Sequence, residues 1–133
     1  LQGVPCLNDG IAQDISGNRI PGQADLSYNI AITKTFLTGS GSVDIRLSRK
    51  YSDGGYADIW NNERSYIPKV SSGDLLVSYR PNDGDWYVNG FVKNLDDSRD
   101  LIYLRAGSNF QGGNLYGSIS EPRTFGLMFG TKF

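Results

Sequence analysis

Residues 26–36, LSYNIAITKTF, decide the fold class, because apolar and polar side chains alternate along the whole stretch. A period of two places alternate side chains on opposite faces and is typical of a β-strand. Lys34 is the one charged residue in the apolar row, and it lies near the strand end, where its stem can lie on apolar surface while its ammonium reaches water. The apolar row consists of Leu26, Tyr28, Ile30, Ile32 and Phe36.

The same alternation recurs along the rest of the chain. Seventeen glycines, eight tyrosines and six phenylalanines, beside one methionine, also favour strands and turns over helices. The sequence therefore predicts an all-β protein, an antiparallel up-and-down meander of about five strands. We expect a loop at 1–23 and strands near 24–36, 42–51, 70–80, 86–104 and 123–133, the fourth with an Asp-rich interruption.

The expected connections alternate between short and long. Short turns lie near Gly39 and Gly84, whereas long polar loops surround Trp60 and Gly113. In outer-membrane barrels the periplasmic turns are short and the loops outside the cell are long. If the chain ends in the periplasm, both short turns fall at the periplasmic rim, so the sequence predicts the C-terminal part of a transmembrane β-barrel.

Aromatic residues lie near the ends of the expected strands. Phe36, Tyr79, Trp86 and Phe133 would form a girdle at the periplasmic rim, with Tyr51 and Tyr103 toward the outer rim. Paired girdles mark membrane interfaces, although aromatic residues also favour strands in general. A soluble β-sandwich or small barrel that binds carbohydrate or another ligand through aromatic loops would alternate too, and it stays open as the alternative.

Composition excludes several classes of function. No apolar run reaches the roughly 18 residues of a transmembrane helix, whereas a barrel strand needs only about 9 to 11 alternating residues. Thirteen basic and fourteen acidic side chains leave no basic face for nucleic acid. Because there is no histidine and only one cysteine, Cys6, we expect no enzyme activity, no metal site and no cofactor.

Three other features have alternative interpretations. Cys6 is either a small loop residue or the partner of a cysteine before Leu1. Asp58 and Glu63 could imitate a catalytic carboxylate pair. Asp96, Asp97 and Asp100 could bind calcium, but acidic residues in exposed loops are usually only solvated.

Three stretches resemble TonB-dependent receptors. PRTFGLMFGTKF at 122–133 resembles their closing strand, FVKNLDD at 91–97 resembles a strand end before an acidic turn, and DISGNRIPGQADLSYNI at 14–30 resembles a loop-to-strand transition. Together they cover nearly the whole chain.

The resemblance implies a bacterial outer-membrane barrel of about 22 strands filled by a plug domain. Such receptors take up scarce ligands such as iron–siderophore complexes. This chain would supply the C-terminal portion of the barrel, in contact with outer-membrane lipid, the remaining strands and the plug. The segment that contacts TonB would lie outside it. Five strands cannot close without an edge, which fits a chain that needs these partners.

Two groups of residues are candidates for function. The resemblance implies an assembly signal for the barrel-assembly machinery at Phe125, Leu127, Phe129 and Phe133. Loops on a rigid scaffold commonly carry recognition, so the long loops supply the candidates for ligand binding. These candidates are Tyr56, Trp60, Asn61, Asn62, Arg64, Asn109, Phe110, Gln111 and Tyr116. Each could equally well only order its loop.

Overall fold

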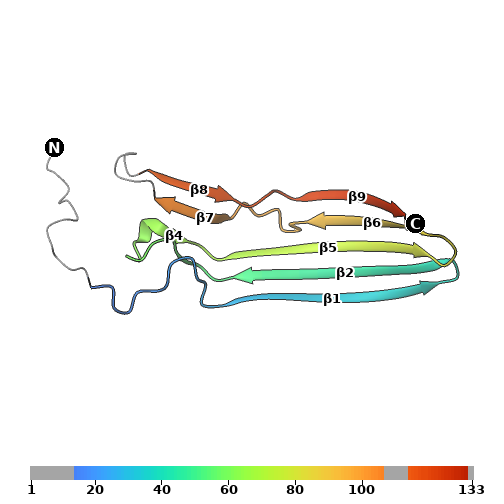
Figure 1. The fold of residues 1–133 in the computed structure, drawn as a ribbon, viewed down its shortest axis with the longest axis horizontal. Helices are drawn as coiled ribbons and strands as arrows, with labels where there is room; N and C mark the ends of the chain where they lie inside the picture. The colour runs from blue at the N-terminus through green and yellow to red at the C-terminus, as the bar shows by residue number, and fades with distance from the viewer. Residues whose placement is uncertain (1–13, 107–113, 132–133) are drawn as a thin grey trace.

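The computed structural model describes residues 14–106 and 114–131. The structure is all-β and is built on one five-stranded antiparallel sheet, the main sheet, in the order β1-β2-β5-β6-β9 (Figure 1). Neighbours in this sheet are consecutive along the meander, as the alternation predicts. The main-sheet strands are β1 (Ser27–Thr38), β2 (Gly41–Ser52), β5 (Val70–Pro81), β6 (Trp86–Lys93) and β9 (Thr124–Thr131).

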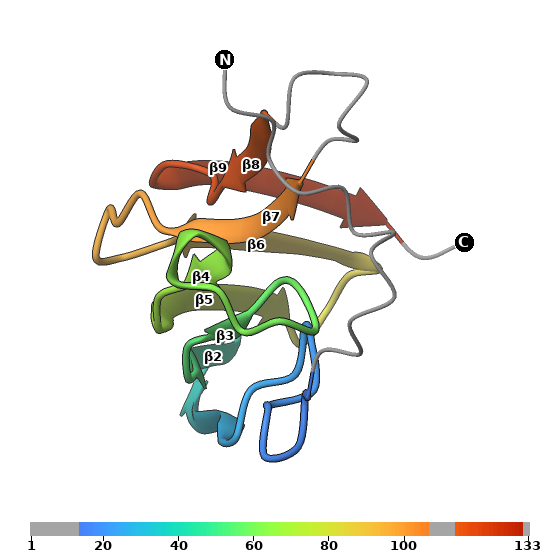
Figure 2. The same ribbon diagram turned by 90° about the vertical axis from the view of Figure 1, so that its left-hand side faces the viewer.

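Two small hairpins and one short helix order the long connections. β3 (Gly55–Tyr56) pairs with β4 (Tyr66–Ile67), and the 3-10 helix η1 (Glu63–Ser65) lies between them in the chain. β7 (Leu101–Ala106) pairs with β8 (Leu115–Ile119) in a sheet of its own. Both hairpins lie at the end of the main sheet away from the short turns (Figure 1), and Figure 2 looks onto this end.

The strand register gives the main sheet two chemically different faces. In one cross-strand row Ile32 lies opposite Leu47 and Leu47 opposite Leu75. Leu75 lies opposite Val92, and Val92 opposite Phe125. We call the side that carries this row the apolar face. Odd-numbered residues of β1 and even-numbered residues of β2 and β5 lie on the opposite side, the polar face.

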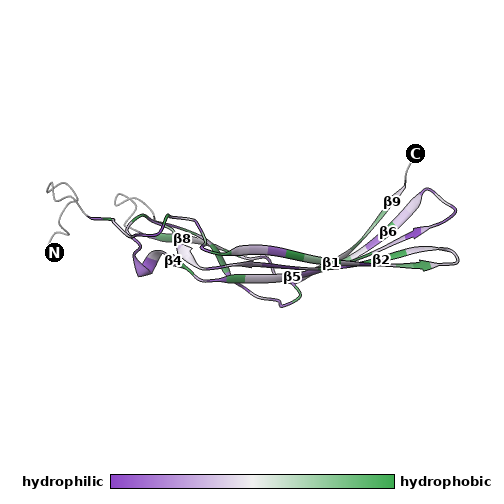
Figure 3. Cartoon of the chain, turned by 90° about the horizontal axis from the view of Figure 1, so that it is seen from below, coloured by the Kyte–Doolittle hydropathy of each residue, from purple (hydrophilic) through white to green (hydrophobic). Residues whose placement is uncertain are grey.

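The apolar face has no second layer over it. Ile32 is 69% exposed, Phe125 79% and Leu127 83%, and no hydrophobic side chain within 14–106 and 114–131 is buried. The sheet is twisted, and its strands fan out toward the short turns (Figure 3). The alternative β-sandwich requires a facing sheet to cover this surface. The described part of the chain has none, so the sandwich interpretation is wrong for this fold.

The two short turns lie side by side at one end of the sheet. Gly39 and Ser40 join β1 to β2, and residues 82–85 join β5 to β6. The Asn82 N–H donates to the Ser40 carbonyl over 3.0 Å, and the Asn82 side-chain amide donates to the Gly39 carbonyl over 3.2 Å. Two separate turns are thereby linked into one rim, to which β9 also runs (Figure 1).

The fourth predicted strand, 86–104, is wrong in its second half. β6 ends at Lys93, and residues 101–106 leave the main sheet to pair with β8, inside the expected loop. Asn94 and Asp97 cause the break, because both have left-handed backbone angles, φ 54° and 52°, that end a strand. Tyr103 therefore lies on the separate hairpin and not at the outer rim of the main sheet. Cys6 and Phe133 lie outside the described residues.

We predict that Gly41→Ala destabilises the protein by about 1 to 3 kcal/mol. A β-carbon at Gly41 would overlap the Arg80 carbonyl oxygen and approach the Pro81 Cα to 2.8 Å, and both are backbone atoms that cannot rotate away. The urea midpoint of the purified protein measures the loss. Gly39→Ala is the matched control, since nothing lies within 4 Å of its β-carbon. Equal midpoints for the two variants would contradict this packing.

Candidate functional site

Two of the candidate ligand-binding residues in the first long loop form hydrogen bonds that order the loop. The Asn61 side chain accepts from the Arg19 N–H over 2.6 Å and donates to the Arg19 carbonyl over 3.0 Å. Asn62 caps η1 by accepting from the Arg64 N–H over 3.1 Å. The Asn61 amide therefore holds the loop against Arg19, and the Asn62 amide holds the first turn of η1.

The other candidates in this loop differ in their availability. Tyr56 packs edge-on against Tyr66, with ring centroids 5.2 Å apart. Trp60 is 42% exposed, and the Arg64 side chain is exposed as well. Trp60 and Arg64 are thus exposed to solvent, whereas Tyr56 lines a cavity.

The second long loop is only partly described. Asn109, Phe110 and Gln111 lie outside the described residues. Tyr116 lies on β8, is 53% exposed, and is the cross-strand partner of Arg105. β7 contacts both β4 and η1, so the two long connections lie against each other at the end of the molecule away from the short turns (Figure 2).

The acidic residues of the 94–100 turn form hydrogen bonds and an ion pair with other residues of the chain. Asp96 forms an ion pair with Arg49 at 2.6 Å, and Asp100 accepts from the Ser98 hydroxyl over 2.7 Å. Asp97 accepts from the Arg123 N–H over 2.9 Å, and this hydrogen bond lowers the pKa of the Asp97 carboxyl. No group of three or more His, Cys, Asp or Glu side chains in the described residues is placed to hold a metal ion.

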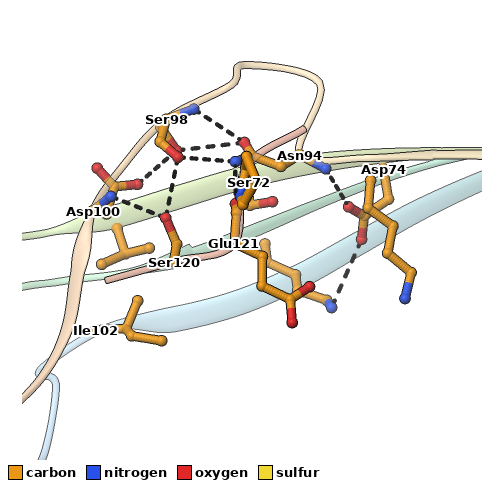
Figure 4. A pocket seen from close by; sticks show the side chains of 12 residues that line it. Ser72, Asp74, Asn94, Ser98, Asp100, Ile102, Ser120 and Glu121 are labelled. Atoms are coloured by element: carbon orange, nitrogen blue, oxygen red, sulfur yellow. Dashed lines mark hydrogen bonds and ion pairs between the residues drawn. The ribbon is translucent and has the colours of Figure 1, made fainter. Parts of the chain in front are cut away.

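Asn94 forms the centre of a latch that ties the end of β6 to the segment before β9. Its side-chain amide donates to the Ser98 and Glu121 carbonyls over 2.9 and 2.8 Å, and its oxygen accepts from the Ser98 N–H over 3.2 Å. The residue is only 6% exposed. Ser120 adds bonds to Ser98 and Asp100, so the network spans both sides of the β7–β8 hairpin (Figure 4).

A polar cavity of about 280 Å³ opens beside the latch on the polar face. It lies where β2, β5 and β6 end, and Figure 4 shows Asp74 on one side of it and Asp100 and Ile102 on the other. Its charged lining residues are Lys50, Asp74, Lys93, Asp100 and Glu121. None of these residues was among the predicted ligand-binding residues, although the period-two pattern places Lys50, Asp74 and Lys93 on one face.

A second cavity of about 290 Å³ adjoins the first. Tyr56, Ile67 and Pro68 line it, and Val70 and Ile102 line both cavities. Ile102 is 51% exposed, so an apolar side chain projects between the two hollows. Among the ligand-binding candidates in the described residues, only Tyr56 lines either of these cavities.

Further toward the short turns, the polar face carries a network of charged and hydroxyl groups. Asp44 accepts from the Thr35 hydroxyl over 2.6 Å and forms an ion pair with Arg80 at 2.9 Å. Arg46 donates to the Thr33 hydroxyl over 3.4 Å. The side chains of three neighbouring strands are thereby bonded across this face.

Aromatic side chains border the apolar face at both ends. Near the short turns, Trp86 lies 5.7 Å from Tyr79 and 6.1 Å from Phe129, measured between ring centroids. At the opposite end Tyr28 and Tyr51 stack at 5.1 Å. Tyr28 and Phe36 are eight residues apart, which is about 27 Å along a strand at 3.4 Å per residue. An apolar band about that wide thus separates the two aromatic groups.

No helix in the described part of the chain is long and apolar enough to span a membrane. No protein-family model and no curated protein matches the sequence.

The main sheet is a five-stranded antiparallel meander that matches part of the barrel of a TonB-dependent receptor. That receptor is the ferric yersiniabactin uptake receptor FyuA from Yersinia pestis, whose crystal structure aligns with a TM-score of 0.73 at 18% sequence identity. The alignment covers 86% of this chain and 17% of the FyuA chain, so the chain spans about a sixth of the structure that it resembles. At this identity the likeness establishes the fold alone.

We predict that Asn94→Ala loosens the latch, because four side-chain hydrogen bonds are lost and a left-handed backbone position no longer carries asparagine. The local free energy of opening should fall by about 1 to 3 kcal/mol. Hydrogen exchange at residues 94–100 and 120–123 measures it. Asn62→Ala, which removes only the exposed cap of a short helix, should leave those amides unchanged. Unchanged exchange in Asn94→Ala would contradict the latch.

Proposed function

We propose that this chain forms five consecutive strands of a transmembrane β-barrel in an outer-membrane, TonB-dependent uptake receptor. The observation that carries the proposal is the apolar face, which runs across five strands and in which no hydrophobic side chain of the described residues is buried. An apolar surface of this extent facing water would be an aggregation hazard. Facing acyl chains, the same surface needs no cover.

The aromatic borders fit the thickness of a membrane. A barrel presents an apolar band about 25 Å tall between two aromatic girdles, and its strands are tilted by about 40°. The span of about 27 Å along the strand from Tyr28 to Phe36 then rises about 21 Å along the membrane normal. Trp86, Tyr79 and Phe129 would then lie at the periplasmic interface, and the Tyr28–Tyr51 stack at the outer one. The short turns would face the periplasm, and both hairpins the outside.

The unpaired edges of the sheet call for neighbouring strands. β1 and β9 each have one side without a partner in the described residues. Within lipid an unpaired backbone group costs several kcal/mol, so a spanning sheet has to close into a barrel. The similarity to a segment covering 17% of FyuA supports closure by further strands of the same receptor. A plug domain and the TonB-contacting segment would belong to the rest of that receptor.

The polar face would line the water-filled interior of the barrel. Its ion pairs and hydroxyl groups suit water and not acyl chains. FyuA is described as a ferric yersiniabactin uptake receptor. By extension, we propose that this chain takes part in the uptake of a scarce ligand such as an iron–siderophore complex. The exposed residues Trp60, Arg64 and Tyr116 are the candidates for its first contact outside the cell.

We predict that Ile32→Arg destabilises the inserted protein by about 2 to 4 kcal/mol, because Ile32 lies midway between the aromatic borders, where lipid is driest. Ala31→Arg is the matched control, since its side chain points to the polar face, opposite Ser48. It should cost less than about 1 kcal/mol. Urea unfolding from lipid vesicles, followed by tryptophan fluorescence, measures both. Equal costs, or a monodisperse 133-residue protein without detergent, would overturn the membrane assignment.

The end of β9 is proposed to act as the signal for the barrel-assembly machinery. Phe125, Leu127 and Phe129 lie on the apolar face and are 66% to 83% exposed, so they form an accessible row that Phe133 extends in sequence. Deleting Phe133 from the full receptor should lower the amount of assembled barrel in the outer membrane, read as the heat-modifiable band on a gel. Phe133→Tyr serves as the control, because it keeps an aromatic residue at the end of the chain. Unchanged assembly without Phe133 would contradict this role.

A further inference from the structure

The polar cavity is lined by charges of both signs, two lysines and three carboxylates. Lys50 and Lys93 come from β2 and β6, whereas Asp100 and Glu121 come from the two segments that the Asn94 latch joins. Lys50 is already paired with Asp74 at 3.8 Å. Lys93 and Glu121 form no ion pair with each other or with any other described residue, although both line the same cavity.

This mixture of charges selects against simple ions. A lone anion near Lys93 would also meet the carboxylates of Asp100 and Glu121, and a lone cation near Glu121 would meet two lysines. A molecule that carries both an ammonium and a carboxylate can pair its ammonium with the carboxylates of the cavity and its carboxylate with a lysine. Charge-assisted hydrogen bonds of this kind are the stronger ones in proteins.

The adjoining cavity adds an apolar requirement. Ile67, Pro68 and the ring of Tyr56 line it, and Val70 and Ile102 are shared with the charged cavity. Volumes of about 280 and 290 Å³ are each near the lower limit of ligand pockets, and the two shared residues place the cavities next to each other. A ligand that fills both halves has charged groups at one end and an apolar or aromatic group at the other.

We infer that the paired cavities bind a peptide-like zwitterion, with its carboxylate at Lys93, its ammonium at Glu121 and Asp100, and an apolar side chain beyond Ile102. The inference deepens the proposed function, since it names the chemical class of ligand that this wall of the barrel interior recognises. None of the exposed loop candidates is needed for it.

The test is isothermal titration of the full protein in lipid discs with the dipeptide Phe-Phe. Measurable binding is expected, and Lys93→Gln and Glu121→Gln should each weaken it by about tenfold, the value of one charged hydrogen bond. N-acetyl-Phe-Phe, which lacks the ammonium, should bind wild type about tenfold more weakly yet lose nothing further in Glu121→Gln. Gly-Gly, which lacks the apolar groups, should bind more weakly than Phe-Phe.

Lys34→Gln is the matched control, because it also removes one lysine charge but lies on the apolar face. It should leave the dissociation constant within about twofold, as expected for a site without contact. No binding of Phe-Phe to protein that has inserted into discs would overturn the inference and leave the membrane assignment intact. Equal effects of N-acetylation in wild type and Glu121→Gln would also overturn it.

Discussion

The cross-strand register of the main sheet is the constraint on which the rest of the structure depends. Side chains alternate with a period of two, so a slip of one residue between neighbouring strands would exchange the faces of one of them. Ile45 lies between Lys34 and Val77 in its row, and a slip would place Asp44 or Arg46 there instead. With no buried core in the described residues, the backbone ladders and the match of apolar rows hold the sheet together.

The apolar face carries two charged residues, Arg49 and Lys34, and neither lies in its middle row. Arg49 lies close to the outer end of β2, and its guanidinium passes over Gly73 on the next strand to reach Asp96 at 2.6 Å. A β-carbon at position 73 would come within 3.3 Å of that guanidinium, so the glycine leaves the space for the ion pair. Lys34 lies two residues from Phe36, at the inner aromatic border, where a long stem can carry its ammonium to water. The midline row from Ile32 to Phe125 carries no charge at all.

The sequence predicted the main sheet because the information for it is local. The alternation within residues 26–36 alone assigns each side chain to one face of the strand, and the glycines near positions 39 and 84 mark the turns. The outer end could not be predicted in this way. Asn94 bonds to Glu121, 27 residues away, and Asn61 bonds to Arg19, 42 residues away. Such pairings decide which amides are structural and which strands leave the sheet, and no pattern within one segment reveals them.

The break at Asn94 also explains why a cavity exists on a sheet that is otherwise a single wall. Had β6 continued in the register that it shares with β5, residues 94–97 would lie beside residues 70–73 of β5, and no turn would border the cavity. Instead two left-handed residues turn the chain, the latch fixes the turn against residues 120–123, and Ile102 projects over the outer ends of the strands. The hollow below it collects charges from three strands and from the turn. The same local strain that made the fourth strand hard to predict therefore builds the most site-like feature of the molecule.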